Sequence, residues 1–419
     1  MLHTIKLLLF IACLLLLDRY VLSGLRGISK KWRWFHRENF TRKYWTVTIS
    51  IVIGALLVIY IKVGFAVRMV LLILFFVTYL CKLSYAVFLL ADDVRRLFIY
   101  LLGRGKKPAA EKPADAHAIP RSEFLVQAGL LAGAVPLAAI GLNMQSGLYD
   151  YHVKRHNLYL RNLPKAFDGL RLGQISDIHS GSFKNPRAVK GGVDMLMAEK
   201  ADLIFFTGDL VNGWIGEMHG YQNIFSKIKA PLGVFSSLGN HDYGDYAEFK
   251  NEAARQWNFN TLVATHKAMG WQLLRNESRR LKVGNEEIGI LGCENWGTLS
   301  RFPRRGRMDL TVKNTDDLPV KLLLSHDPSH WRAQVLPQYP QVDMAFAGHT
   351  HGMQMGVQTE NFQWSPIQYI YNEWAGFYRE GHQQLYVNVG YGFIGLPGRV
   401  GILPEITIFT LKSGEEPKA

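Results

Sequence analysis

The stretch Leu238-Gly239-Asn240-His241-Asp242 ends an apolar run that begins at Pro231. The run predicts a buried strand, and the polar residues after it predict a tight turn at the carboxyl end of that strand. Asn240 offers a neutral oxygen ligand for a metal ion, and His241 beside it offers a proton donor. Because Asn and His also cap turns, the stretch gains meaning only from the polar residues that follow other apolar runs.

Residues that can bind metal ions follow the other apolar runs of the same region. They are Asp177 and His179 after 170–176, Asp209 after 203–207, His326 after 320–324, and His349 and His351 after 344–347. In open α/β sheets, sites form outside the carboxyl ends of the strands, so we expect these side chains to gather at one edge. Glycines stand directly before Asp209, Asn240 and His349, and they allow sharp turns at these points.

Short β-rich runs alternate with polar or amphipathic stretches from residue 151 onward. The predicted strands are 170–176, 203–207, 233–238, 288–291, 320–324, 344–347, 385–389 and 406–411, and the predicted helices are 186–200, 221–229 and part of 246–269. Strands alternate with helices in the first half and dominate in the second half. This order predicts an α/β fold that contains a sandwich of sheets.

The ordered blocks resemble the pattern of the calcineurin-like metallophosphoesterase family. That pattern is Asp-x-His, Gly-Asp, Gly-Asn-His-Asp/Glu, a lone His and Gly-His-x-His, and every block occurs here in order from Asp177 to His351. The resemblance covers residues 158–411, and the segments 390–401 and 404–406 look like a membrane-anchored bacterial branch. It implies a four-layer α/β/β/α sandwich and the activity of a metal-dependent phosphoric ester hydrolase.

The resemblance also implies roles for the residues of the blocks. One metal ion would be held by Asp177, His179, Asp209 and His351, and a second by Asp209, Asn240, His326 and His349. A hydroxide between the two ions would attack phosphorus in line. His241 would stabilise the pentavalent state or protonate the leaving oxygen, and Asp242 would orient His241 by a hydrogen bond. Mixed oxygen and nitrogen ligands admit Mn, Fe or Zn, of which we favour Mn.

The first 145 residues differ in charge and hydropathy from the rest of the chain. Residues 1–145 contain 19 Lys and Arg against 7 Asp and Glu, whereas residues 146–419 contain 29 against 27. The nearly neutral second part argues against nucleic-acid binding. Apolar runs at 5–22, 46–63, 69–90 and 124–142 each approach the roughly 20 residues that cross a bilayer. We therefore expect a transmembrane helical region at 1–145, with about four spans in a bacterial inner membrane, and a catalytic domain at 146–419.

Basic loops set the expected orientation of the spans. Seven Lys or Arg lie within residues 26–43 and seven within 95–121, and such loops stay on the cytoplasmic side. Four spans then place the catalytic domain outside the cytoplasm. Two facts oppose this placement: a single miscounted span would reverse it, and four basic residues between 154 and 165 closely follow the fourth run.

Together these features predict a membrane-anchored phosphoesterase for phosphomonoester, phosphodiester or pyrophosphate bonds. The anchor favours a lipid-linked or envelope substrate. A nucleotide-linked acyl sugar of lipid A synthesis, which some relatives hydrolyse, is cytoplasmic and conflicts with the preferred orientation. Two other interpretations stay open. The chain could be a non-enzymatic membrane protein that binds a ligand or partner through this domain. The spans could also have a transport or sensing role of their own, which the charged residues Asp18, Arg19 and Lys82 within the apolar runs suggest.

Several conspicuous residues outside the blocks are expected to be structural. We expect this of His266, His330 and His382, and we expect Asp327 to form a turn. The segment Arg301–Arg307 either binds a diphosphate or headgroup or, as we favour, is a solvated loop. The aromatic side chains within 364–378 either line an apolar groove, meet the membrane interface or pack in a core. The three cysteines form neither a disulfide framework nor a Cys-based zinc site.

Overall fold

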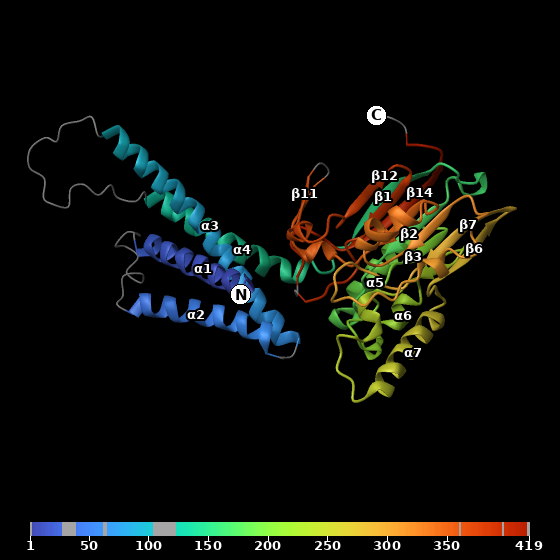
Figure 1. The fold of residues 1–419 in the computed structure, drawn as a ribbon, viewed down its shortest axis with the longest axis horizontal. Helices are drawn as coiled ribbons and strands as arrows, with labels where there is room; N and C mark the ends of the chain where they lie inside the picture. Colours follow the sequence, from blue (N-terminus) through green and yellow to red (C-terminus); the bar gives the residue numbers. More distant parts are fainter. Residues whose placement is uncertain are drawn as a thin grey trace, which may run out of the picture. The chain divides into compact units, whose positions relative to one another are not determined.

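The computed structural model describes residues 2–26, 39–61, 65–103, 123–359, 362–395 and 398–416. The chain divides into two compact units, Met1–Leu142 and Asn143–Ala419. Unit 1 is helical and unit 2 contains the sheets (Figure 1). Each unit is described by itself below.

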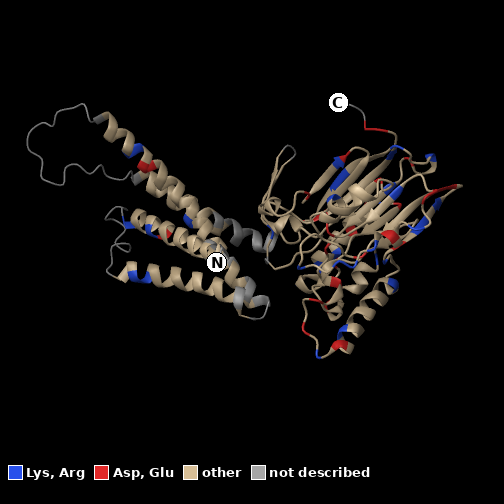
Figure 2. Cartoon of the chain, in the orientation of Figure 1, with Lys and Arg blue, Asp and Glu red and all other residues tan. Residues whose placement is uncertain are grey.

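Unit 1 is built from long apolar helices. They are α1 (Leu2–Arg26), α2 (Asn39–Tyr60), α3 (Phe65–Gly103) and α4 (Glu123–Ser146), of which α4 continues into unit 2. Within the described residues, three segments are long and apolar enough to cross a membrane: Leu7–Arg26, Asn39–Val58 and Val70–Leu102. The fourth predicted run lies in α4, where the apolar segment Phe124–Val135 is shorter. Charged residues are sparse along the middle of α1 and α2 (Figure 2).

A buried polar cluster joins three of these helices. Asp18 of α1 is fully buried and forms an ion pair with Lys82 of α3. Its carboxylate also accepts hydrogen bonds from the hydroxyls of Tyr79, at 2.8 Å, and Tyr44, at 3.0 Å. Thr48 of α2 lies 2.9 Å from the Lys82 ammonium. Asp18 and Lys82 therefore neutralise each other between helices, in keeping with the cost of an unpaired charge in a membrane.

The described strands of unit 2 form two six-stranded sheets and one short hairpin. The first sheet has the order β1 (His152–Leu160), β14 (Glu405–Ser413), β2 (Arg171–Ile175), β3 (Leu203–Phe206), β4 (Val234–Ser236) and β5 (Gln272–Leu273). The second has the order β12 (Gly376–Glu380), β13 (Gln383–Val387), β9 (Met344–Ala347), β8 (Lys321–Leu324), β7 (Glu286–Gly292) and β6 (Glu277–Val283). The hairpin pairs β10 (Val357–Gln358) with β11 (Gln363–Trp364). Strands β2 to β5 are parallel, as are β13, β9, β8 and β7.

The two sheets pack face to face, and helices cover their outer faces. In β3, Leu203 and Phe205 point into the core between the sheets, whereas Ile204 and Phe206 point toward α5 (Pro186–Ala198), α6 (Gln222–Phe225) and α7 (Glu252–Ala268). On β8, Leu323 faces the other way, toward α8 (Met308–Thr311) and α9 (Leu336–Gln338). Because both faces of these strands are buried, their sequences are continuous apolar runs. The four-layer α/β/β/α prediction is confirmed.

The structure adds strands that the sequence pattern did not predict. The most important is β1, whose residues are mostly polar and only partly buried. It pairs in parallel with β14, from His152 opposite Glu405 to Leu160 opposite Ser413. The partner lies about 250 residues away in the sequence, so the pairing that makes β1 a strand depends on the tertiary fold rather than on its own composition.

Candidate metal centre

Two groups of ligand residues, all buried except the partly buried His349, meet at the carboxyl ends of the central strands. One group is Asp177, His179 and His351, and the other is Asp209, His326 and His349; within each group the ligand atoms lie within 4.8 Å of one another. These residues follow β2, β3, β8 and β9. The parallel arrangement of these strands brings all six residues to one edge of the sandwich, as the sequence predicts.

Asp209 lies between the two groups. Its Oδ2 atom is 3.1 Å from Nε2 of His326 and 3.5 Å from Nε2 of His179. In the first group, Oδ1 of Asp177 is 3.1 Å from Nε2 of His351. A carboxylate in this position can contact cations on both sides, which is the geometry that a two-metal site requires.

Among the buried side-chain atoms that have no hydrogen-bond partner within the described part of the chain, three belong to predicted ligands. They are Nε2 of His179, Nε2 of His351 and Oδ1 of Asn240. An unsatisfied buried polar atom costs about 1–3 kcal/mol, so such atoms are rare in folded proteins. Imidazole nitrogens and an amide oxygen are metal ligands, and their convergence on Asp177 and Asp209 fits divalent cations at this site.

The backbone at the centre is strained where the ligands are attached. Asp177, His179, Asp209, His349 and His351 all have positive φ, between 48° and 72°. Non-glycine residues rarely adopt this left-handed conformation, and each instance costs on the order of 1–3 kcal/mol. Five such residues among the ligands indicate that the loops are held in place by the surrounding fold to aim side chains at one point.

Small residues are required where the ligand loops touch. A Cβ atom on Gly348 would lie 2.0 Å from Oγ of Ser176 and 2.1 Å from Oδ2 of Asp177. A Cβ atom on Gly239 would lie 2.2 Å from Oδ1 of Asp209. The glycines that precede the ligands therefore permit close approach of the loops, in addition to sharp turns.

Hydrogen bonds on the outer side of the histidines fix their rings. Nδ1 of His179 is 3.0 Å from Oδ1 of Asn212, and Nδ1 of His326 is 2.7 Å from the carbonyl oxygen of Thr207. For His349 the order is reversed: Nε2 lies 2.8 Å from the Tyr371 hydroxyl, and Nδ1 lies 3.3 Å from Nε2 of His326. Such partners orient metal-binding histidines and set which nitrogen is free.

Sequence reasoning missed these supporting residues. Asn212 stands five residues before Glu217, whose carboxylate accepts a hydrogen bond from the Asn212 amide at 2.6 Å. Tyr371 belongs to the aromatic group noted in the sequence, but its ring is buried and its hydroxyl contacts a candidate ligand. The sequence signal for Asn212 was its place three residues after Asp209, whereas Tyr371, 20 residues after His351, was marked only by the aromatic residues around it.

The hydrogen-bond partner predicted for the His241 ring was wrong. Nδ1 of His241 lies 2.8 Å from the carbonyl oxygen of Asn212, and the ring packs against Tyr246 with centroids 4.5 Å apart. The fully buried carboxylate of Asp242 accepts hydrogen bonds from the amides of Asp209, Leu210 and Gly239, at 2.8–2.9 Å. Asp242 therefore ties two ligand loops together, and the Asn212 carbonyl positions His241.

Electrostatics at the centre favour positive charge between the carboxylates. Burial acts against protonation of His326, but the charges of Asp209 and Asp177 raise its pKa to about 10. Burial also opposes ionisation of Asp177, yet His351 and His326 hold the pKa of Asp177 well below its usual range. Burial, followed by the charge of Asp209, raises the pKa of Asp242 to about 7. The carboxylates thus stabilise a positive charge on His326, whereas burial lowers the pKa of His179 and His349 and favours the neutral imidazole that binds metal.

The residues outside the blocks mostly play structural roles. His266 is buried with Nδ1 3.0 Å from Oγ of Ser236, and His330 is buried between Ser325 and Gln334. His382 is exposed.

Asp327 forms the predicted turn, since its Oδ1 accepts a hydrogen bond from the Ser329 amide at 2.9 Å. Its Oδ2 also lies 3.6 Å from Nε2 of His349.

Three arginines of the segment have hydrogen-bond or ion-pair partners, and the fourth, Arg301, stacks on a ring beside the centre. Arg305 pairs with Asp245 at 3.0 Å and Arg307 with Asp309 at 2.7 Å. Nε of Arg304 donates to the carbonyl of Gly297 at 3.0 Å.

The exposed guanidinium of Arg301 stacks over the Phe302 ring at 4.7 Å. The buried Phe302 ring in turn packs edge-on against His349, with centroids 4.8 Å apart. The segment is therefore not simply a solvated loop.

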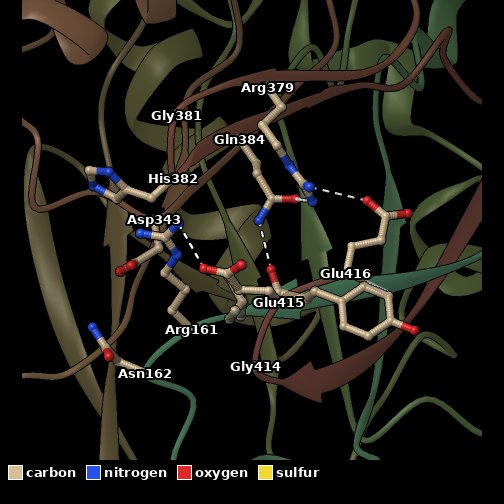
Figure 3. Close-up of a pocket in the computed structure, with 12 residues that line it drawn as sticks. Arg161, Asn162, Asp343, Arg379, Gly381, His382, Gln384, Gly414, Glu415 and Glu416 are labelled. Atoms are coloured by element: carbon tan, nitrogen blue, oxygen red, sulfur yellow. Dashed lines mark hydrogen bonds and ion pairs between the residues drawn. The ribbon is translucent and has the colours of Figure 1, made fainter. Parts of the chain in front are cut away.

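A cavity of about 490 Å³ lies at the opposite edge of the sandwich (Figure 3). It is lined by Leu160 at the end of β1 and Gln384 near the start of β13. Four of its charged side chains form ion pairs: Arg161 with Glu415 at 2.8 Å, and Arg379 with Glu416 at 3.1 Å. Because the candidate ligands follow the other ends of the strands, this cavity is separate from the metal centre.

Comparison with known proteins identifies both parts of the chain. Residues 4–148 match the family model described as "Probable Calcineurin-like phosphoesterase, transmembrane domain", and residues 170–353 match "Calcineurin-like phosphoesterase". The metallophosphoesterase YkuE of Bacillus subtilis is 30% identical over 292 residues, which are 68% of this chain and 94% of that protein.

Two further relatives are membrane-associated or have a named activity. A Danio rerio protein described as "Transmembrane protein with metallophosphoesterase domain" is 28% identical, over 60% of this chain and 55% of the relative, so this chain spans about half the length of that protein. The UDP-2,3-diacylglucosamine pyrophosphatase LpxG of Chlamydia trachomatis is 27% identical, over 55% of this chain and 81% of the relative. These matches, together with the ligand centre and the apolar helices, show that the chain is a membrane protein of the calcineurin-like metallophosphoesterase family, whose members are phosphoric ester hydrolases.

Proposed function

We propose that this chain is a membrane-anchored enzyme that hydrolyses phosphoester or pyrophosphate bonds with two divalent metal ions. The observation that carries the proposal is the convergence of two groups of ligand atoms at one edge of the sandwich. Asp177, His179 and His351 form one group and Asp209, His326 and His349 the other, with the ligand atoms of each group within 4.8 Å of one another. A domain that only binds a partner has no use for this convergence, because burying these side chains and holding five of them at positive φ costs free energy.

The metal ions would divide the ligands between them. Asp177, His179 and His351 would hold one ion, Asn240, His326 and His349 the other, and Asp209 would contact both. Carboxylate and amide oxygens mixed with imidazoles suit manganese, iron or zinc, and the oxygen ligands favour manganese. When bound, two such ions activate water near neutral pH and neutralise the charge on the phosphoryl oxygens.

His241 is the residue that we assign to proton transfer. Its Nδ1 is engaged by the Asn212 carbonyl at 2.8 Å, so Nδ1 carries a proton and Nε2 is the ring atom left to reach the substrate. A ring protonated on both nitrogens can donate the Nε2 proton to the leaving oxygen. The hydrogen bond from Nδ1 holds the ring in one orientation.

Arg301 is the residue that we assign to a second anionic group of the substrate. The guanidinium is exposed and stacks on Phe302, which contacts His349. Burial raises the pKa of the Tyr246 and Tyr371 hydroxyls, and the charge of Arg301 acts in the opposite direction on both. Tyr246 contacts Asn240 and Tyr371 contacts His349. The charge of Arg301 therefore acts on groups that adjoin two of the candidate ligands. A diphosphate offers a second phosphate for such a cation.

The substrate class follows from the anchor and from the relative with a named substrate. A pyrophosphate attached to a lipid-bearing group agrees both with the membrane anchor and with the substrate named for that relative. We place the catalytic unit outside the cytoplasm of a bacterial inner membrane, with the uncharged run 124–142 as the fourth crossing, although its apolar segment Phe124–Val135 is shorter than the other three. A reporter fused after Ala419 tests this placement: an extracytoplasmic signal supports an envelope substrate, and a cytoplasmic signal supports a nucleotide-linked acyl sugar.

The central experiment measures activity and metal content on the same sample. The purified full chain, loaded with Mn²⁺, is incubated with p-nitrophenyl phosphate, bis(p-nitrophenyl) phosphate and a uridine diphosphate sugar. We expect hydrolysis of at least one of these compounds and its loss in Asp209→Ala. Equal activity in Asp209→Ala contradicts the two-metal proposal. A metal-loaded chain that hydrolyses none of them favours the non-enzymatic interpretation.

A further inference from the structure

Six large apolar side chains are exposed within a short segment of unit 2. They are Met353, Val357, Phe362, Trp364, Tyr369 and Ile370, with exposed fractions from 37% to 77%. We refer to these six residues as the apolar rim. In the described part of unit 2, the other large hydrophobic residues of comparable exposure are Met195, Trp214, Tyr246, Trp257, Leu310 and Phe377. Half of the exposed apolar side chains of this unit therefore lie within residues 353–370, and such concentrations mark interaction surfaces.

The backbone that carries the apolar rim is held by hydrogen bonds. Val357 pairs with Trp364 in the β10–β11 hairpin, and the Gly356 amide donates to the Val400 carbonyl at 2.9 Å. Oγ of Ser365 donates to the Gly352 carbonyl at 2.7 Å and starts the short helix η8 (Pro366–Tyr369). The apolar side chains are thus presented to solvent by an ordered framework, so their exposure is a property of the fold.

Both ends of the segment are attached to the metal centre. Met353 follows the candidate ligand His351 by two residues, and Ile370 directly precedes Tyr371. The Tyr371 hydroxyl lies 2.8 Å from Nε2 of His349. The rim therefore borders the site at which the phosphoester would be cleaved.

The hairpin also lies beside the first strand of unit 2. A cavity of about 860 Å³ is lined by His152, Lys154 and His156 of β1 and by Phe362 of the rim. Nζ of Lys154 is 3.0 Å from Oε1 of Gln358 in β10. In the sequence, β1 begins six residues after the end of α4, the last of the apolar helices. The rim thus lies beside β1, the first strand that follows the apolar helices in the sequence.

We propose that the apolar rim inserts into the lipid surface of the membrane in which the chain is anchored. Trp364 and Tyr369 combine an apolar ring with a polar atom, which suits the boundary between headgroups and acyl chains, and the aliphatic neighbours suit the acyl side. Residues 353–371 contain no Lys or Arg, so attachment is apolar and insensitive to salt. Docking here presents lipid-borne phosphoesters to the metal centre, and in this respect the inference rests on the proposed function.

The direct test measures the depth of the rim in a bilayer and needs no activity. The full chain, with its three cysteines replaced by Ala, carries Tyr369→Cys and an environment-sensitive fluorophore, and it is reconstituted in vesicles of phosphatidylethanolamine and phosphatidylglycerol. Trp257→Cys is the matched control, because Trp257 on α7 is 62% exposed and lies outside the rim. Ile370→Cys is a second labelling site should the first variant fold poorly.

We expect brominated acyl chains to quench the label at 369, and dissolved iodide to quench the label at 257 instead. High salt should leave the result at 369 unchanged. Quenching at 369 by iodide to the same extent as at 257 overturns the proposal. Protection at 369 from both quenchers also overturns it, since the rim would then be covered by protein, such as a second copy of this chain.

A kinetic test links the rim to substrate access. The double variant Tyr369→Ser/Ile370→Ser should lower the ratio of activity on a bilayer-embedded diphosphate to activity on bis(p-nitrophenyl) phosphate, whereas Trp257→Ser should leave that ratio as it is. An unchanged ratio in the double variant contradicts delivery of substrate through the rim. If the wild-type chain hydrolyses neither compound, the proposed function fails, and the quenching result still decides whether the rim enters lipid.

Discussion

The carboxylate of Asp242 accepts a hydrogen bond from the backbone amide of Asp209 at 2.9 Å. The same Oδ2 atom accepts from the amide of Gly239 at 2.9 Å, so Asp242 connects the loop after β3 with the loop after β4. Asp209 is the carboxylate that lies between the two ligand groups. Asp242 thus positions the central ligand, Asp209, through a hydrogen bond with its backbone amide.

Asp242→Asn should weaken metal binding and lower stability. The amide replaces one carboxylate oxygen by a donor that faces backbone N–H groups, and the loss of a buried charge-assisted hydrogen bond costs about 2 kcal/mol. Loss of an outer partner typically lowers metal affinity roughly 10- to 100-fold. Thermal unfolding and Mn²⁺ titration of the full chain in detergent measure both effects. Unchanged metal affinity would contradict the role of Asp242 in positioning Asp209.

His241→Ala should separate chemistry from metal binding. The ring contacts Tyr246 and the Asn212 carbonyl and is not part of either ligand group. Removal of a proton donor lowers kcat by about 10²- to 10⁴-fold, while the metal content should stay at two ions per chain, as the proposal requires. Metal analysis and steady-state kinetics on the same preparation provide the comparison. A loss of metal in His241→Ala would make His241 a ligand.

Asp209→Ala should reduce the metal content below two ions and abolish most activity. The carboxylate lies 3.1 Å from His326 and 3.5 Å from His179, so its loss removes the shared ligand. The fall in activity should exceed the roughly 10- to 100-fold that the loss of an outer partner causes. Asn260→Ala, on the exposed side of α7, is a control that should retain both metal and activity.

Arg301→Gln should raise KM for diphosphates more than for simple diesters. A charge-assisted hydrogen bond is worth about 1.5–3 kcal/mol, so KM for a uridine diphosphate sugar should rise about tenfold or more. KM for bis(p-nitrophenyl) phosphate, which has no second phosphate, should change much less. Arg307→Gln is the matched control, because Arg307 is already paired with Asp309. Equal rises for both substrates would assign Arg301 to the reacting phosphoryl group instead.

Gly348→Ala should disturb the centre, although it adds only one methyl group. The new Cβ would fall 2.0 Å from Ser176 and 2.1 Å from Asp177, and overpacking of this kind costs about 1–3 kcal/mol. We expect a lower unfolding temperature and weaker Mn²⁺ binding. Gly191→Ala in α5, where a Cβ meets nothing within 4 Å, should stabilise the fold by about 0.5–1 kcal/mol. Equal behaviour of the two variants would refute the close approach of the loops.

His266 should make stability depend on pH. Burial lowers the pKa of His266 to about 3, whereas an unfolded histidine has a pKa of about 6.5. The unfolded state therefore binds more protons below pH 6.5, and stability falls as pH drops from about 6.5 toward about 3. His266→Gln should reduce this slope by up to about 1.4 kcal/mol per pH unit. Denaturant unfolding at several pH values measures the slope, and Trp257→Ser on the same helix should leave it unchanged.

The architecture and the region of the site were predictable from the sequence. Both faces of β3 and β8 are buried, so their apolar runs are continuous and easy to recognise. The polar β1 was missed because only its distant partner β14 makes it a strand. The partner of His241 was assigned wrongly, since Asp242 is its neighbour in the sequence but points its carboxylate at backbone amides.

The sequence by itself determined which residues can bind metal and that they follow buried strands, because hydrophobic runs and turn residues are local properties of the chain. The tertiary structure alone decided how these residues cooperate. It places Asp209 between the ligand groups, joins Tyr371 to His349, and brings Arg301 beside the centre through Phe302. These contacts connect loops that are far apart in the sequence, and their hydrogen bonds and distances depend on how the two sheets pack.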